Sequence, residues 1–179
     1  MANELNTIKG YVLVELFDAQ GNLKEEQRIH NLITDAGDLY YATRGAEQVL
    51  PGGPAEGTAL KVTGMKLGTG TAAVHKAAIN VGSALGTYKT GSNVLFDATY
   101  PQVSNLGSLP GVQIVYKTTF NPGVATDTAL TECVIVNDAG TPGTSTAANT
   151  ISRLLFASAI NKGASDTLAV TWNHKFLGS

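Results

Sequence analysis

The sequence predicts a mainly-β fold: an antiparallel β-sandwich, jelly-roll-like or immunoglobulin-like, with one short helix near residues 35–44. Short segments with a period of two recur along the chain, separated at fairly even spacing by Gly, Pro and Asn turns. Long helical patterns do not alternate with these segments, which disfavours a parallel α/β sheet. The length of 179 residues fits one domain. We expect this domain to span residues 8–179, after an N-terminal arm of residues 1–7.

The N-terminal part of the chain predicts a β-hairpin followed by the helix. Residues 8–17 are rich in β-formers, residues 18–22 form a turn cluster, and residues 23–29 carry charged side chains. We assign those charges to the solvated face of an edge strand, where they would block unwanted pairing. Thr34 can act as the N-cap of the helix, and Gly45 suits its C-terminal end.

The middle of the chain predicts loops around two strands. Residues 46–59 contain two Pro and three Gly, which indicates a long loop. Residues 60–67 alternate again and predict a strand, which the Gly-Thr pairs of residues 68–71 end. No Gly-Lys-Ser/Thr follows those pairs, so a phosphate-binding loop is disfavoured. Residues 94–103 predict a further strand, interrupted at Pro101, which indicates an edge or a bulge.

The C-terminal part predicts four strands, at residues 112–120, 129–136, 151–160 and 166–176. The turn at residues 161–165 joins the last two, and Asn-Lys-Gly between apolar runs is typical of a hairpin. We therefore expect a closing β-hairpin. The last strand places Leu168, Val170 and Trp172 on one face, so Trp172 is expected to be buried in the core.

We expect no catalytic chemistry and no metal or cofactor. The three histidines, His30, His75 and His174, lack metal-ligand spacing, and His174 is expected to be a packed or rim residue. Cys133 stands in an apolar strand, where a small packed thiol is expected. No Gly-x-Ser-x-Gly or similar context marks a nucleophile. The interpretation is that the protein is not an enzyme.

The composition bears on the expected partners. Charged residues make up 15% of the chain, against about a quarter in ordinary proteins. A surface poor in charge is easier to bury against a neighbour, because charges resist desolvation. The net charge of −2 disfavours nucleic-acid binding. No apolar run is long enough to cross a bilayer, and no signal peptide is evident, so we expect synthesis in a cytosol and no membrane partner.

Several short segments stand in an order that resembles structural proteins of tailed-bacteriophage virions. They are NLITDAG at residues 31–37, LGTGT at 67–71, TFNPG at 119–123, LTE at 130–132 and INKGASDTLAVTW at 160–172. Their joint order is the specific feature, and it covers most of residues 8–176. The chain departs from that family pattern at residues 72–76, which read AAVHK where Pro and acidic residues are usual.

This resemblance implies a capsid decoration (cement) protein that binds and stabilises the head lattice. The alternative that it also implies is a tail-tip or fibre component that recognises a host receptor or glycan. A short chain without a heptad tail favours the capsid. The expected partners are then the major capsid protein and further copies of this chain in a homotrimer. The expected location is the capsid surface of the virion, after synthesis in the host cytoplasm.

The N-terminal arm is the expected contact with a partner. It is polar and directly precedes the first strand. Alone it has little to bury, so we expect it to lie on an adjacent subunit and extend a sheet edge there. The residues in this prediction are Met1, Ala2, Asn3, Glu4, Leu5, Asn6 and Thr7.

Overall fold

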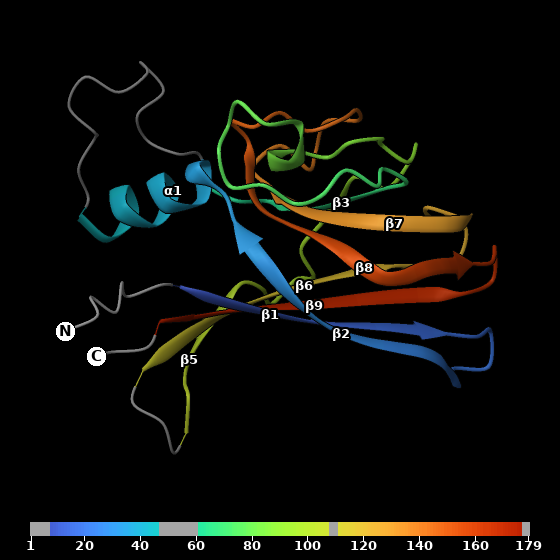
Figure 1. Cartoon of the computed structure of the whole chain (residues 1–179). Coiled ribbons are helices and arrows are strands. Elements are labelled where there is room, and N and C mark those ends of the chain that lie inside the picture. The colour runs from blue at the N-terminus through green and yellow to red at the C-terminus, as the bar shows by residue number, and fades with distance from the viewer. Residues whose placement is uncertain (1–7, 47–60, 108–110, 177–179) are drawn as a thin grey trace.

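The computed structural model describes residues 8–46, 61–107 and 111–176. Its elements and the path of the chain are shown in Figure 1. The helical elements are α1 (Asp35–Ala46) and a short 3-10 turn, η1 (Val81–Ser83). The strands are β1 (Lys9–Phe17), β2 (Leu23–Ile33), β3 (Gly64–Gly68), β4 (Val94–Leu95), β5 (Gln102–Asn105), β6 (Val112–Phe120), β7 (Asp127–Val136), β8 (Thr150–Lys162) and β9 (Thr167–Phe176).

The strands form one antiparallel sheet in the order β4-β3-β7-β8-β2-β1-β9-β6-β5. The sheet curls at β2, because that strand belongs to both halves (Figure 1). Most of β2 pairs with β1, whereas Leu32 and Ile33 at its end pair with β8. The two halves therefore face each other. The prediction of a mainly-β, antiparallel fold with one short helix is confirmed.

The two ends of the sheet order approach each other where the chain leaves β4. There the backbone N–H of Phe96 donates to Thr63 O at 3.0 Å, and the backbone N–H of Asp97 donates to Lys117 O at 2.9 Å. The Asp97 carboxylate also accepts from the backbone and hydroxyl of Thr119. The sheet is thus continuous through β2 and nearly closed on the other side. A sandwich of two separate sheets is not confirmed.

The core fills the space inside the curl. Alternate residues of β1, β6 and β9 point inward and meet apolar side chains of β3, β7 and β8. The predicted core position of Trp172 is confirmed, since its exposed fraction is 0%. Cys133 is also fully buried, as expected for a packed thiol. Burial raises the pKa of that thiol, which keeps it protonated and unreactive.

The first hairpin forms as predicted, but the position of its second strand differs. The interpretation of residues 23–29 as an edge strand holds only in part: β2 as a whole lies inside the sheet order, but residues 23–29 pair with β1 alone. In this stretch the side chain of Gln27 bridges to β8. Its amide nitrogen donates to Ser158 O at 2.9 Å, and its oxygen accepts from the backbone N–H of Ala157 at 2.7 Å. A side-chain amide thus replaces backbone pairing where the sheet bends, and solvent still reaches the neighbouring charges.

The predicted closing hairpin is wrong in its pairing. Strands β8 and β9 follow each other along the chain, yet β8 pairs with β7 and β2, and β9 pairs with β1 and β6. The connecting turn carries the chain from one half of the sheet to the other. Lys162 is buried there and donates to the carbonyl oxygens of Asn121 and Asp166. The two strands face each other across the core, where Ile160 and Leu168 both pack.

The helix begins as predicted, at the residue after Thr34. The Thr34 hydroxyl accepts from the backbone N–H of Gly37 at 3.1 Å and donates to Thr150 O at 2.5 Å. A side chain at Gly37 would meet Ile151 O at 2.2 Å from its Cβ, so the glycine allows the helix to approach β8 closely. The helix covers one end of the curled sheet (Figure 1).

The remaining predictions concern the middle of the chain and the N-terminal arm. The strand predicted at residues 94–103 forms as two short strands, β4 and β5, with Pro101 directly before β5. Of the strand predicted at residues 60–67, the second half forms, as part of β3, and residues 61–63 are not in a strand. The N-terminal arm of residues 1–7 lies outside the described residues, and so does most of the long loop predicted at residues 46–59.

Candidate functional site: a basic hollow beside the first strand

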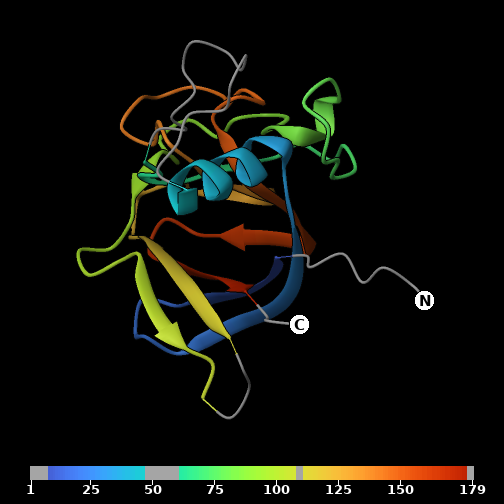
Figure 2. The ribbon, with the colours of Figure 1, turned by 90° about the vertical axis from the view of Figure 1, so that its left-hand side faces the viewer.

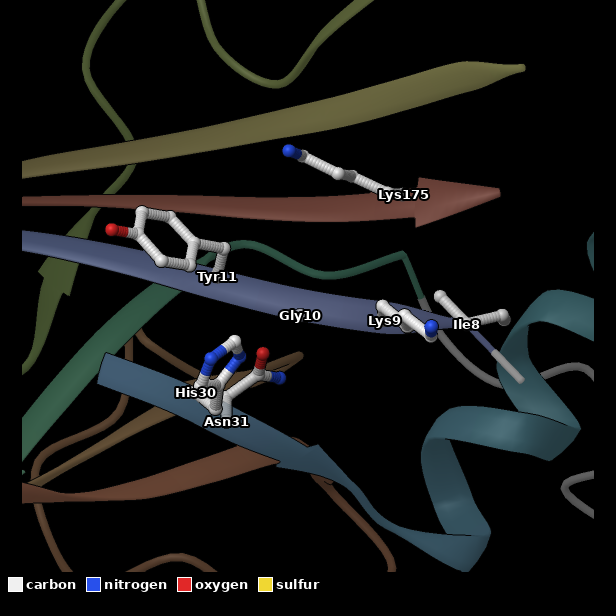
Figure 3. A pocket seen from close by; sticks show the side chains of 7 residues that line it. All are labelled: Ile8, Lys9, Gly10, Tyr11, His30, Asn31 and Lys175. Carbon is white, nitrogen blue, oxygen red and sulfur yellow. The ribbon is translucent and has the colours of Figure 1, made fainter. Parts of the chain in front are cut away.

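A hollow of about 380 Å³ opens where β1 begins and where β2 and β9 end (Figure 3). Its lining comes from these three strands and from Ile8, the residue before β1. Its volume lies within the range of pockets that hold small ligands. The hollow is therefore the candidate site within the part of the chain that the structure describes.

The hollow exists because β1 and β2 separate at this point. Gly10 and Asn31 form the last pair of the β1–β2 ladder, and the next residue of β2, Leu32, pairs with β8. The Asn31 side chain then turns over Gly10. A Cβ at Gly10 would lie 1.2 Å from Asn31 Oδ1, so only glycine leaves room for that amide. The Oδ1 atom is buried and accepts no hydrogen bond from the described residues.

The hollow is lined by three basic side chains. Lys9 of β1 and Lys175 of β9 are directly paired in the ladder, and His30 of β2 stands beside them. Neither lysine forms an ion pair with the described residues, and the described lining contains no carboxylate. Like charges directly opposite each other on a sheet are destabilising. The protein therefore concentrates positive charge here, although its net charge is −2.

The wall of the hollow is aromatic. The rings of Tyr11 and His30 meet edge to face with their centroids 5.7 Å apart. The Lys175 ammonium lies 5.9 Å from the centroid of the Tyr11 ring, a cation–π contact. Figure 3 shows Tyr11 and His30 side by side on neighbouring strands, with Lys175 extended toward the tyrosine. The arrangement offers an aromatic surface with the Lys175 ammonium beside it.

Behind the hollow, a buried polar network fixes Asn31. Its amide nitrogen contacts Ser152 Oγ and lies 3.1 Å from His174 Nε2. On the other side of the ring, His174 Nδ1 contacts the Tyr41 hydroxyl, which lies 3.0 Å from that of Tyr116. Ser152 Oγ donates to Leu32 O, so it must accept from the Asn31 amide nitrogen. The same nitrogen faces His174 Nε2, which is therefore the unprotonated ring atom.

His174 is thus neutral and packed. Of the two expected placements, packed or at the rim, the structure shows the first. It is fully buried, and this desolvation lowers its pKa from 6.5 to about 3. The remaining proton sits on Nδ1 and points to the Tyr41 hydroxyl. Burial also raises the pKa values of Tyr41 and Tyr116. The network holds Asn31 in place beside the hollow. The imidazole of His174 itself is buried and is not exposed to a ligand.

The other predicted positions lie elsewhere. His75 is in the loop before η1, where its Nδ1 accepts from the backbone N–H of Ala77 at 3.2 Å. No group of three or more His, Cys, Asp and Glu side chains that could hold a metal ion occurs among the described residues. The predicted contact residues, Met1, Ala2, Asn3, Glu4, Leu5, Asn6 and Thr7, lie outside them.

A buried ion pair organises the loop segments around η1. Glu132 and Arg153 are both fully buried, and Arg153 Nη2 lies 2.8 Å from Glu132 Oε2. The Glu132 carboxylate also accepts from the backbone N–H groups of Gly70, Gly86 and Thr87. The Gly-Thr segment disfavoured as a phosphate-binding loop therefore does present a backbone N–H to an anion, and that anion is a side chain of the protein itself.

Sequence reasoning did not find the hollow. The parity of β9 separates Lys175 from Trp172, which places the lysine on the outer face. Nothing in the local sequence, however, pairs Lys9 with Lys175, since these residues stand at opposite ends of the chain. The detectable signal was weaker: Gly10 interrupts an otherwise apolar strand, and a glycine there indicates close approach by another group.

Comparison with known proteins gives no relative: no protein-family model, no curated protein and no solved structure matches this chain. Among the helices of the described residues, none has the length and apolar character needed to cross a membrane.

Proposed function

We propose that the protein is a non-enzymatic structural component of a bacteriophage virion, in the role of a capsid decoration protein. The order of short segments that resembles virion proteins supports this role, and so does a surface poor in charge. Decoration requires contacts with the major capsid protein and with further copies of the chain. The proposal therefore predicts surfaces on the domain that remain unpaired in the isolated chain.

The observation that carries the proposal is the free edge of the sheet at β5. Strands β4 and β5 end the sheet order, and the segment between them runs along one side of the molecule (Figure 2). Leu95 on β4 is 57% exposed, and Val103 on β5 is 72% exposed. Strand β5 reads Gln-Val-Ser-Asn and carries no charge. Edge strands of monomers usually carry charges that block pairing, so an uncharged edge suits addition of a strand from a second copy.

The test of the proposed role is the number of copies in purified virions, measured by quantitative mass spectrometry against the major capsid protein. Decoration predicts hundreds of copies in each particle. Absence from the particle would overturn the proposal. A handful of copies would overturn the capsid location in favour of the tail.

A role in recognising a host receptor or glycan is the second candidate. The hollow favours it, because aromatic rings beside basic groups are chemistry that a polar ligand can use. The copy number separates the two roles, since a tail-tip component is present in few copies.

Charging the β5 edge is expected to reduce self-association. Val103→Lys places an ammonium on the uncharged edge strand, where a second copy would have to desolvate it. The measurement is the molar mass in solution by light scattering across a concentration series. Ile79→Lys is the matched control, because Ile79 is 97% exposed but lies in a loop away from the sheet edge. A β5 variant that associates like the wild type and like this control would remove the edge from the proposal.

A further inference from the structure

The hollow beside β1 holds two lysines that stand directly opposite each other, which no other two basic residues of the described ladders do. Lys24, Lys66, Lys76 and Lys89 each lie within 4.0 Å of a carboxylate oxygen, whereas Lys61 and Lys117 form no ion pair with the described residues. Lys9 and Lys175 form no such pair with the described residues, although the ladder places them directly opposite each other. An exposed lysine pair of this kind repels itself. An anion beside the pair would offset the repulsion and would bind with charge-assisted hydrogen bonds.

The rest of the lining indicates what carries the anion. The Tyr11 and His30 rings form an aromatic wall, and Ile8 and Gly10 continue it at the start of β1. A bare inorganic anion would use the ammonium groups and leave this wall unused. A hollow of about 380 Å³ has room for a small ring compound that lies against the aromatic wall and directs its charged group to the lysines.

The amide of Asn31 lies behind the hollow and is fixed there. Its nitrogen is held by Ser152 and His174, so the side chain cannot rotate without breaking that network. The Gly10 backbone lies against its oxygen. The side of the hollow formed by β1 and β2 is therefore preorganised, which lowers the entropy lost when a ligand binds.

We propose that this hollow binds a small anionic ring compound, with a carboxylate or phosphate group at Lys9 and Lys175 and its ring against Tyr11 and His30. Acidic sugars and phosphorylated sugars are the chemical class that fits. This inference goes beyond the proposed place in the virion and does not depend on it. A decoration protein and a tail protein could both carry such a site.

The test is a titration of the full chain, followed through backbone amide resonances by NMR. The probes are glucuronate for a carboxylate, glucose 6-phosphate for a phosphate, and neutral glucose and inorganic phosphate as comparisons. We expect saturable shifts at Gly10, Tyr11 and Lys175 with at least one of the charged sugars, and none with glucose. Absence of saturable shifts with both charged sugars would overturn the proposal. Inorganic phosphate that binds as tightly as the charged sugars would overturn the role of the aromatic wall.

Variants test whether the lysine pair binds the charged group of the ligand. Lys175→Gln is expected to weaken binding about tenfold or more, because it removes one charge-assisted contact. Lys117→Gln is the matched control. It lies on the same face of the sheet, directly paired with Thr171, and is not part of the hollow. Its affinity should stay within about twofold of the wild type, as expected for a distant independent site. Equal affinities of the two variants would overturn the assignment, provided that both give the dispersed amide spectrum of the folded protein.

Discussion

Glu132→Ala is expected to lower the free energy of unfolding by more than about 5 kcal/mol, the largest stability effect that we predict for one side chain. Removing one partner of a buried ion pair costs about 3–5 kcal/mol, because the remaining charge stays buried without compensation. That remaining charge is Arg153, whose exposed fraction is 0%. The Arg153 side chain keeps one contact, from Nη1 to Gly82 O at 3.0 Å. This contact does not replace the carboxylate.

The loss of backbone contacts adds to that effect. Glu132 accepts from Gly70 at 2.8 Å, from Gly86 at 3.0 Å and from Thr87 at 2.9 Å. Gly70 is buried, and a buried N–H that loses its acceptor costs about 1–3 kcal/mol, whereas Gly86 and Thr87 are exposed and their N–H groups can bind water instead. The carboxylate fastens two loop segments, on either side of η1, to strands β7 and β8. Its removal is expected to loosen both segments together.

The measurement is urea-induced unfolding, with Asp127→Asn as the matched control. Asp127 lies on the same strand, and its carboxylate is 2.9 Å from Lys89 Nζ, but both side chains remain partly exposed. Exposed pairs contribute about 1 kcal/mol or less. The loss of unfolding free energy in Glu132→Gln should lie between those of Glu132→Ala and Asp127→Asn, because glutamine keeps an acceptor and the shape of the side chain but loses the charge. Equal losses for Glu132→Ala and Asp127→Asn would contradict the structural role of the buried pair.

Local patterns of the sequence predicted the individual elements well. The strand at residues 112–120 and the helix after Thr34 form where expected, because alternation and capping act over a few residues. Pairing of distant strands could not be predicted in this way. The turn at residues 161–165 resembles a hairpin turn, yet Lys162 is buried in it and joins carbonyl oxygens from both sides of the core. Long-range packing determines which strand lies beside β9.

Buried charges were the second feature that the sequence did not predict. Sequence reasoning places charged residues on the surface, but Lys66 is only 1% exposed and pairs with Asp138 at 3.0 Å. Glu132 is followed by the apolar residues 133–136 and Arg153 by the apolar residues 154–157, and nothing in the local sequence indicates that the two meet. The hollow could not be predicted for the same reason, since Lys9 and Lys175 become neighbours only through the pairing of β1 with β9. Each of these groups depends on sheet order, which short-range patterns do not determine.

His174 is expected to make the protein less stable as the pH falls. Its pKa is about 3 in the folded protein, because burial disfavours the charged ring, and 6.5 in the unfolded chain. Protons therefore bind the unfolded state first. The contribution of the neutral ring to stability is complete above pH 6.5 and is lost progressively as the pH falls toward 3. At 1.36 kcal/mol for each pKa unit, the full loss is about 5 kcal/mol, of which about 2 kcal/mol falls between pH 7 and pH 5.

The groups packed against the ring give no compensation. Asn31, Tyr41, Tyr116 and Trp172 surround it, and none of them carries a negative charge in this pH range. The carboxylates with shifted pKa values titrate lower, since partners lower those of Asp18, Asp127 and Asp166. The interval from pH 7 to pH 5 therefore reports mainly on histidine.

The experiment compares the free energy of unfolding at pH 7 and pH 5 for the wild type, His174→Gln and His30→Gln. The wild type and His30→Gln should both lose about 2 kcal/mol, because His30 is exposed and its replacement leaves the buried ring in place. His174→Gln starts less stable, since the ring fills a fully buried position, but its stability should change little with pH. A pH dependence that survives in His174→Gln would show that another group controls it. It would also mean that the wild-type network tolerates a charged imidazole at His174. The contacts of Ser152 and Asn31 argue against this, because they fix one neutral tautomer of that ring.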